Sequence, residues 1–194
     1  TYGALWMRIP ESRGQNFANL QTLANQAAIA LERSIRGAEL VQKQKQLEAA
    51  YSELEITYDR TLTSLMWALD ARDSDTEGHS VRLSRLACML GKEVGLSGHQ
   101  LKALERGALL HDIGKIGVSD TILHKTSELT EEEWEIMRNH PEIGARIVEG
   151  IPFLQDTLPV IRFHHERWNG SGYPLGLKGS DIPIQARIFA VAEV

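Results

Sequence analysis

The sequence is poor in cysteine, in basic runs and in long apolar stretches, and each scarcity excludes a class of protein. Its 194 residues include one cysteine, Cys88, so no internal disulfide can form, which suits a reducing compartment. No stretch approaches the roughly 18 apolar residues of a membrane span, and no signal peptide opens the chain. The formal net charge is -5, without a basic half. We therefore expect a cytoplasmic protein with no nucleic-acid partner and no membrane span in this segment.

The two ends of the sequence lack the features of ordinary chain termini. TYGALWMRIP begins as if inside a strand, and AVAEV ends inside an apolar run. We interpret the sequence as a segment of a longer polypeptide. Its hydrophobic content of 42 % suits a folded domain with attached pieces.

Residues 1–36 contain a short strand-like run, GALWMRI, then a turn region and a helix, FANLQTLANQAAIALERS. The apolar residues of that helix recur at helical spacing. This ending resembles the last strand and C-terminal helix of GAF sensory domains, over about 30 residues. Any strand followed by any helix would give the same pattern, so both interpretations stay open here.

Residues 37–61 are polar and nearly free of helix breakers. A narrow apolar seam runs along them and into the next segment in steps of three, four or seven, which predicts a parallel two-stranded coiled coil and hence a homodimer. The seam consists of Leu40, Leu47, Tyr51, Leu54, Tyr58 and Leu65. The alternative is a single helix packed on its own domain.

Residues 62–194 read as successive amphipathic helices with no credible sheet, so the predicted fold class is all-α. The expected helices are LTSLMWALDARD, GHSVRLSRLACMLGKEVG, LSGHQLKALERGALLHDIGKIG, LTEEEWEIMRNHPEIGARIVEG, residues 153–166 and IPIQARIFAVAEV. Thr130, followed three residues later by Glu133, forms a capping box at the start of the fourth.

Five of the seven histidines lie near expected helix ends, and three acidic residues accompany them. They are His79, His111, His140, His164 and His165, and the acids are Asp75, Asp112 and Glu193. A lone histidine on a helix is usually a packing or surface residue, and His99 and His124 are interpreted so. Five histidines together with carboxylates predict a metal centre. Nitrogen and oxygen ligands without thiolates suit iron, manganese, cobalt or zinc.

Four of these residues form two pairs of sequence neighbours, which favours more than one ion. His111 and Asp112 would lie about 100° apart on a helix. They converge most easily on a metal pair, because a carboxylate bridges two ions while the imidazole binds one. His164 and His165 likewise diverge from neighbouring positions and can hold different ions of one cluster.

The motifs HDIGKIG (111–117) and HHERWNGSGYP (164–174) resemble the HD-GYP family, a subgroup of the HD superfamily of metal-dependent phosphohydrolases. The resemblance runs from about Leu62 to the end of the chain. It implies an HD-type helical bundle that hydrolyses cyclic di-GMP to pGpG or GMP with two, in some members three, ions, commonly iron or manganese. The implied ligand positions are Asp75, His79, His111, Asp112, His140, His164, His165 and Glu193.

The resemblance also implies roles for other residues. Lys115 matches the lysine that contacts the scissile phosphate, and Asp112 and Lys115 are the expected catalytic residues. Gly172, Tyr173 and Pro174 match the name-giving loop, which lies beside the site and is also used for contacts with protein partners.

The sequence departs from the family pattern at two ligand positions. Glu193 stands where the family has an aspartate, so either the backbone or the ion must shift. Asp75 stands where members with a third ion have a glutamate. The sequence also stops before the helix that keeps substrate-holding basic residues in the family, so residues 62–194 correspond to a domain truncated at its C-terminus.

These residue types permit in-line attack on phosphorus by a metal-activated hydroxide, with Lys115 neutralising the negative charge that develops. We expect an upstream sensory domain to regulate this reaction. Two alternatives remain at this point. One is another HD-type activity on a nucleotide or a different cyclic dinucleotide. The other is a catalytically weak domain that binds cyclic dinucleotides or proteins as a signalling module.

Overall fold

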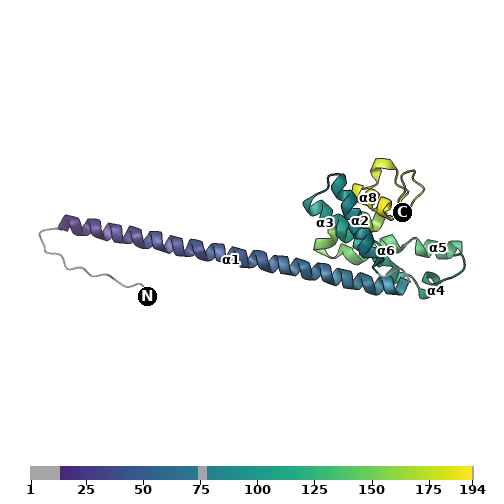
Figure 1. The fold of residues 1–194 in the computed structure, drawn as a ribbon, viewed down its shortest axis with the longest axis horizontal. Coiled ribbons are helices and arrows are strands. Elements are labelled where there is room, and N and C mark those ends of the chain that lie inside the picture. Colours follow the sequence, from purple (N-terminus) through teal and green to yellow (C-terminus); the bar gives the residue numbers. More distant parts are fainter. Residues whose placement is uncertain (1–13, 74–77, 194) are drawn as a thin grey trace. The chain divides into compact units, whose positions relative to one another are not determined.

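The computed structural model describes residues 14–73 and 78–193, and in these ranges all regular structure is helical (Figure 1). The predicted all-α fold is therefore confirmed. The strand-like GALWMRI run and Asp75 lie outside the described residues. The helices are α1 Gly14–Asp73, α2 His79–Glu93, α3 Gly98–Leu110, η2 Ile113–Gly117, α4 Asp120–Leu123, α5 Glu131–Met137, α6 His140–Glu149, η3 Pro152–Thr157, α7 Leu158–Phe163, η4 Gly179–Asp181 and α8 Ile184–Ala192.

Helix α1 runs for 60 residues without a break. It contains no proline and is rich in Ala, Gln, Glu and Leu, which are strong helix formers. The chain divides between Glu55 and Ile56 into two units, six residues before the boundary expected at Leu62. All six seam side chains are exposed in the single chain, so their pairing with a second chain stays a prediction. No helix in the described part of the chain is both long enough and apolar enough to cross a membrane.

The second unit has a core of two apolar clusters. In the first, the last turns of α1 (Leu62, Met66 and Leu69) pack with residues from the end of α3, from α6, η3 and α7. In the second, α2 and α8 pack against α3 and α7 around the fully buried ring of Phe189. Burying a large aliphatic or aromatic side chain contributes about 1.5–3 kcal/mol. Because α3 and α7 belong to both clusters, their C-terminal ends are fixed from two sides.

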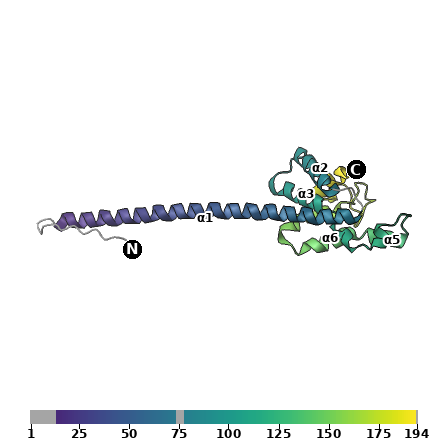
Figure 2. The ribbon, with the colours of Figure 1, turned by 60° about the horizontal axis from the view of Figure 1, so that its bottom comes forward.

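A polar and aromatic contact also attaches α1 to the bundle. Asp59 accepts from Arg106 at 2.8 Å and pairs with Lys102 at 2.7 Å. Tyr58 stacks on Phe153 with ring centroids 4.7 Å apart. Tyr58, one of the predicted seam residues, thus already has a partner in its own unit. Figure 2 shows the same unit from another side, with α3 and α6 next to the last turns of α1.

Glycines allow the elements around the histidines to approach closely. A Cβ on Gly107 would lie 2.8 Å from Cβ of Val160, so α3 and α7 meet almost backbone to backbone there. A Cβ on Gly114 would overlap the carbonyl oxygen of His140 and come 2.5 Å from the amide nitrogen of Gly144. The turn after α3 is thereby seated directly on α6.

Several predicted helices are confirmed. Helix α2 ends at Glu93, and α8 begins directly after Pro183. The capping box is present: the Glu133 amide donates to the Thr130 hydroxyl at 3.3 Å, and the Thr130 amide donates to the Glu133 carboxylate at 2.7 Å.

Three predicted helices are wrong in their extent, each at a histidine. Helix α3 ends at Leu110 and a 3-10 turn follows, so His111 and Asp112 do not lie on one continuous helix. Residues 131–150 form two helices instead of one, and residues 153–166 form η3 followed by α7, which ends at Phe163. Pro141 explains the second break, because it has no N–H to donate to the Met137 carbonyl.

We predict that Gly114→Ala destabilises the fold. The added methyl group has backbone atoms of α6 in its way, and overpacking of this kind costs about 1–3 kcal/mol or more. For a chain of this size that corresponds to a loss of about 5 °C or more in melting temperature. Gly150→Ala, with nothing within 4 Å of its Cβ, is the matched control for circular dichroism melting. Equal melting temperatures for the two variants would contradict the close approach.

Candidate metal centre

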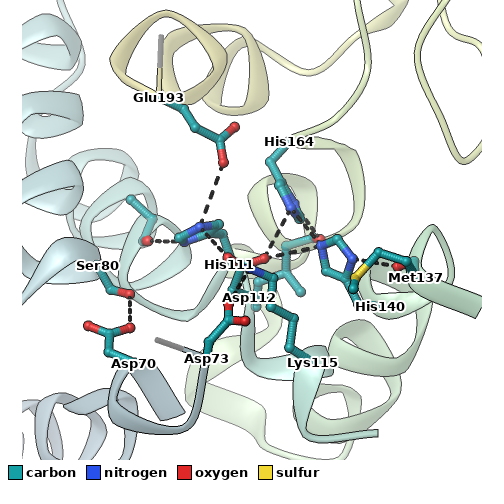
Figure 3. A network of polar contacts seen from close by, with 12 residues as sticks. Asp70, Asp73, Ser80, His111, Asp112, Lys115, Met137, His140, His164 and Glu193 are labelled. Atoms are coloured by element: carbon teal, nitrogen blue, oxygen red, sulfur yellow. Dashed lines mark hydrogen bonds and ion pairs between the residues drawn. The ribbon is translucent and has the colours of Figure 1, made fainter. Parts of the chain in front are cut away.

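Four side chains from three separate segments form a compact cluster. Figure 3 shows three of them, Asp112, His140 and His164. The ligand atoms of Asp112, His140, His164 and His165 all lie within 4.8 Å of one another. His111 lies on the other side of Asp112, with its Nε2 3.1 Å from Oδ2. Four of the five predicted histidines are thus brought together around one carboxylate.

The orientation of three rings is fixed by the ends of helices. Nδ1–H of His111 donates to the Ala108 carbonyl at 2.8 Å, and that of His140 to the Met137 carbonyl at 2.8 Å. His164 makes the same bond to the carbonyl three residues before it, at 3.0 Å. These carbonyls lie in the last turns of α3, α5 and α7, where backbone oxygens lack a partner within the helix. Each ring therefore satisfies a helix end, and in its neutral form it presents the lone pair of Nε2.

The three Nε2 atoms point toward the Asp112 carboxylate. His140 Nε2 lies 3.2 Å from Oδ1 and 3.1 Å from the Nε2 of His164, which is itself 3.8 Å from Oδ1. With the Nδ1 protons on the carbonyls, lone pairs face lone pairs. His111 Nε2 and Asp112 Oδ1 are buried without a hydrogen-bond partner. Such an arrangement is unfavourable unless a cation lies among these atoms.

A proton is a poor candidate for that cation at most of these rings. Burial, together with the neighbouring His165, holds the pKa of His164 well below its usual range. Burial and the nearby His140 lower the pKa of His165 to about 3. Both rings stay neutral in neutral water and keep lone pairs for a metal. Histidine ligands that donate their other N–H to a carbonyl are the usual arrangement at metal sites.

The charges around His111 differ from those at the other rings. Burial alone would lower the pKa of His111, but the Asp112 carboxylate outweighs it and the pKa lies above its usual value. Burial likewise opposes ionisation of Asp112, yet the charge of His111 and its other partners keep the pKa of this carboxyl well below its usual range. The donor set is an ionised carboxylate and imidazoles without thiolate, which fits iron, manganese, cobalt or zinc.

The two oxygens of Asp112 face different groups. Oδ1 faces His140 and His164, whereas Oδ2 faces His111. A carboxylate in this setting can bridge two ions, as the sequence predicts. Glu193, the C-cap of α8, brings Oε1 to 3.7 Å from His111 Nε2, and burial raises its pKa. The side chain of Glu193, one methylene longer than the aspartate of the family pattern, thus lies on the His111 side of the cluster.

Lys115 lies beside the cluster as an ammonium held by two carboxylates. Its Nζ is 2.9 Å from Asp112 Oδ2 and 2.5 Å from Asp73 Oδ2. Burial alone would lower the pKa of Lys115, but the two carboxylates outweigh it and raise the pKa. An ammonium has no lone pair, so it does not act as a ligand. The sequence analysis missed Asp73; its signal is an acid at the last position of the helix that precedes the histidines.

The glycine loop folds onto His165. The ring of Tyr173 stacks on that of His165 with centroids 4.6 Å apart, and the Tyr173 amide donates to the His165 carbonyl at 3.2 Å. The peptide bond between Tyr173 and Pro174 is cis. A Cβ on Gly172 would overlap the same carbonyl, so this position requires glycine. Burial raises the pKa of the Tyr173 hydroxyl.

Glu166 is a second residue that the sequence analysis missed. Its carboxylate is buried and accepts from the amides of Leu175 at 2.7 Å and Leu177 at 2.9 Å. It therefore holds the far half of the loop in place. An acid directly after a histidine pair and before a glycine-rich run is the signal that could have identified it.

A cleft of about 420 Å³ opens beside the cluster. Its lining residues are His164, His165, Glu166, Arg167, Trp168, Tyr173, Ala190 and Glu193. A ligand in this cleft would reach the imidazole of His165 and the carboxylate of Glu193. The cluster is thus buried enough to orient its side chains and still accessible from one side.

His79 is the predicted ligand that the structure does not place in the cluster. It is the first residue of α2, is half-buried, and is not among the four side chains that converge. Its expected companion, Asp75, lies outside the described residues. The ligand roles of these two positions stay predictions.

Comparison with known proteins matches this geometry to a family. The HD domain family matches residues 63–194. The chain is 40 % identical over 153 residues to the cyclic di-GMP phosphodiesterase response regulator RpfG of Xanthomonas campestris, covering 78 % of this chain and 40 % of that protein. It is 41 % identical over 152 residues to a cyclic di-GMP phosphodiesterase of Thermotoga maritima, covering 77 % and 41 %. This chain therefore spans well under half the length of these relatives.

A solved structure supports the fold independently. The crystal structure of a cyclic GMP-AMP specific phosphodiesterase of Vibrio cholerae, V-cGAP3, aligns with a TM-score of 0.56 at 24 % identity, covering 69 % of this chain and 39 % of that one. At this identity the likeness concerns the fold. The family match extends over most of the second unit and includes the whole described cluster. The chain belongs to the HD domain family.

Proposed function

We propose that this chain carries the catalytic domain of a cyclic di-GMP phosphodiesterase of the HD-GYP group, which hydrolyses the messenger to pGpG, GMP or both. The observation that carries the proposal is the convergence on the Asp112 carboxylate of three Nε2 atoms whose rings are each held at Nδ1 by a backbone carbonyl, beside a cleft lined by Tyr173. Relatives at 40 % and 41 % identity, named cyclic di-GMP phosphodiesterases, support the substrate.

The proposed ligands are His79, His111, Asp112, His140, His164, His165 and Glu193, and Asp75 stands at the position that serves a third ion in members that have one. Iron or manganese is the proposed metal: the nitrogen and oxygen donors suit either ion, and these two are common in the HD-GYP group. When bound, such ions supply Lewis acidity toward water and toward phosphate oxygens. The chain supplies rigid imidazoles at His111, His140 and His164, since each of these three rings is fixed at Nδ1 by a backbone carbonyl.

Three side chains account for the rest of the proposed chemistry. Asp112 brings negative charge between the imidazoles and holds Lys115 at 2.9 Å. The ammonium of Lys115 has three N–H groups, and two carboxylates account for two of them. The third donates to a phosphate oxygen as charge develops on it. Tyr173 holds His165 by stacking and lines the cleft.

Two relatives raise a second candidate substrate. Proteins of Vibrio cholerae named 3'3'-cGAMP-specific phosphodiesterases are 36 % and 39 % identical over 144 and 127 residues. The two cyclic dinucleotides share the same phosphodiester bonds and differ in one base. Parallel turnover assays with both substrates therefore decide between them. A chain that binds metal and cyclic di-GMP without hydrolysing either would instead be the signalling module considered from the sequence.

We propose that residues 1–36 are the end of a GAF-like sensory domain, that residues 37–61 are a coiled-coil linker and that residues 62–194 are the phosphohydrolase domain. An upstream sensor would then regulate hydrolysis through α1, which is continuous across both boundaries. The glycine loop is the proposed surface for a protein partner, since Leu175 and Trp168 are both 65 % exposed there.

We predict that the purified chain, reconstituted with Fe²⁺ or Mn²⁺, binds about two ions per chain, as expected for a carboxylate-bridged pair. His111→Ala and Asp112→Ala should remove most of the metal, because each deletes a donor at the centre of the cluster. The matched control is His99→Ala, whose ring is exposed and pairs with Asp156 on the surface. Elemental analysis after gel filtration measures the content. Unchanged metal in both site variants would overturn the ligand assignment.

We predict that Lys115→Ala keeps its metal but hydrolyses cyclic di-GMP about 100-fold more slowly, the scale for losing one preorganised charge-stabilising donor. Lys92→Ala, at an exposed position in α2, is the control. Turnover is followed by chromatography of pGpG and GMP from metal-loaded protein. Wild-type turnover in Lys115→Ala would contradict the proposed role of this lysine in stabilising charge on the phosphate. Loss of metal together with activity would show that it supports the ligands instead.

We predict that two chains pair in parallel through the seam of α1. Leu40, Leu47, Tyr51 and Leu54 are exposed in the single chain, and a helix with so little apolar burial is marginal alone in water. Light scattering at tens of micromolar should give a dimer, and Leu47→Asp should give a monomer. Glu48→Gln, one residue away from the seam position, should leave the dimer intact. A monomeric wild type would contradict the predicted coiled-coil dimer.

A further inference from the structure

Arg72 and Asp73, the last two residues of α1, both contact the segment that carries Lys115. Figure 3 shows Asp73 next to Lys115. Arg72 donates from Nη1 to the Lys115 carbonyl at 3.0 Å and from Nη2 to the Val118 carbonyl at 2.7 Å. Its guanidinium also pairs with the exposed Asp120 carboxylate at 2.7 Å. The Val118 amide donates to the same Lys115 carbonyl at 3.0 Å. Arg72 thus caps the C-terminal end of η2 by donating hydrogen bonds to backbone carbonyls, which are otherwise short of donors at a helix end.

Asp73 contacts the other end of the same lysine. Its Oδ2 accepts from Lys115 Nζ at 2.5 Å, and both side chains are largely buried, with 11 % and 18 % exposed. An ammonium on a four-carbon stem is otherwise free to rotate among several positions. The neighbouring pair Arg72 and Asp73 therefore holds Lys115 at its carbonyl and at its ammonium.

The opposite side of η2 is also fixed. Gly114 lies directly against the His140 carbonyl and the Gly144 amide of α6, so the turn cannot move in that direction. Contacts from α1 on one side and α6 on the other leave η2 a single position. That position sets where the backbone of Lys115 lies and from where its ammonium reaches the cluster.

We propose that Arg72 and Asp73 are positioning residues: Arg72 fixes the backbone of η2, and Asp73 directs the Lys115 ammonium to its place beside Asp112. The proposal rests on the proposed function, since Lys115 is the group through which both residues act. It assigns the end of α1 a second role besides packing. A displacement of α1 would then change the position of Lys115 without removing any metal ligand.

The exposed ion pair does not account for the effect expected of Arg72. Asp120 is 71 % exposed at its side chain, and surface pairs contribute about 0–1 kcal/mol. The two carbonyl contacts are partly buried and are made by one planar guanidinium. Lysine could not reproduce them, because its ammonium lacks the fork of donors.

The first experiment is a set of double-mutant cycles on the full metal-loaded chain with cyclic di-GMP. Arg72→Met and Asp73→Asn should each lower kcat about tenfold or more, with metal content unchanged, because small misplacements of a catalytic group are costly. In the Lys115→Ala background the same substitutions should cost nothing further, because residues that act through one group are not additive. A purely structural role would instead give additive losses, which would overturn the proposal.

A second measurement does not depend on turnover. Hydrogen–deuterium exchange of residues 113–119 should accelerate in Arg72→Met, because the Lys115 and Val118 carbonyls lose their contacts with the Arg72 guanidinium. Arg60→Met, an exposed arginine on the same helix, is the matched control and should exchange like wild type. Equal exchange in both variants would contradict the proposed role of Arg72 in fixing η2, even if activity falls. If the wild type has no activity on cyclic di-GMP, the proposed function is contradicted. The exchange experiment then still tests whether Arg72 fixes η2.

Discussion

The organisation of this HD domain depends on one repeated bond, from a histidine Nδ1–H to the carbonyl three residues before it. His111, His140 and His164 all make it, at 2.8, 2.8 and 3.0 Å. Each bond satisfies a carbonyl that the end of a helix leaves without a partner. Each also fixes which ring nitrogen keeps its lone pair. Without these bonds the rings could rotate or change tautomer, and the Nε2 atoms would not face Asp112 together.

The packing of the bundle serves this arrangement. Helices α3 and α7 take part in both apolar clusters, so the two ends that carry His111 and His164 are fixed from two sides. The ring of Phe189 lies 4.7 Å from that of His111 and closes the site from α8. Grouping several imidazoles around a buried carboxylate is electrostatically costly in an apolar interior. The Lys115 ammonium offsets part of this cost at Oδ2 of Asp112, and a bound cation would offset more of it. The packing energy of the bundle thus holds together a site that a metal ion would stabilise.

The motifs predicted most of the cluster, and the patterns of apolar residues predicted the helices around it. Periodicity located α2, α8 and the capping box of Thr130 and Glu133, because these depend on local sequence alone. It failed at the histidines, where the helices end earlier than their apolar patterns. A side chain that takes over a backbone carbonyl leaves little trace in periodicity, although Pro141 was a readable signal for one break.

Contacts between distant segments could not be read from the sequence. Asp73 precedes Lys115 by 42 positions, and only the packing of α1 against the bundle brings them together. Glu166 gave a local signal, but its role depends on the path of the loop back to Leu175 and Leu177. Tyr58 fitted the predicted seam and yet stacks on Phe153. An apolar stripe identifies a buried face without identifying its partner, because the same periodicity serves a second chain and the chain's own domain.

The central claim is that the Nε2 atoms of the cluster converge on a metal ion. X-ray absorption spectroscopy of the chain loaded with iron or manganese tests it most directly, because it reports the atoms around the ion itself. The account predicts a shell of nitrogen and oxygen without sulfur, with the outer-shell scattering of more than one imidazole, and loss of part of that scattering in His140→Ala. A shell of oxygen alone, unchanged by the substitution, would contradict it.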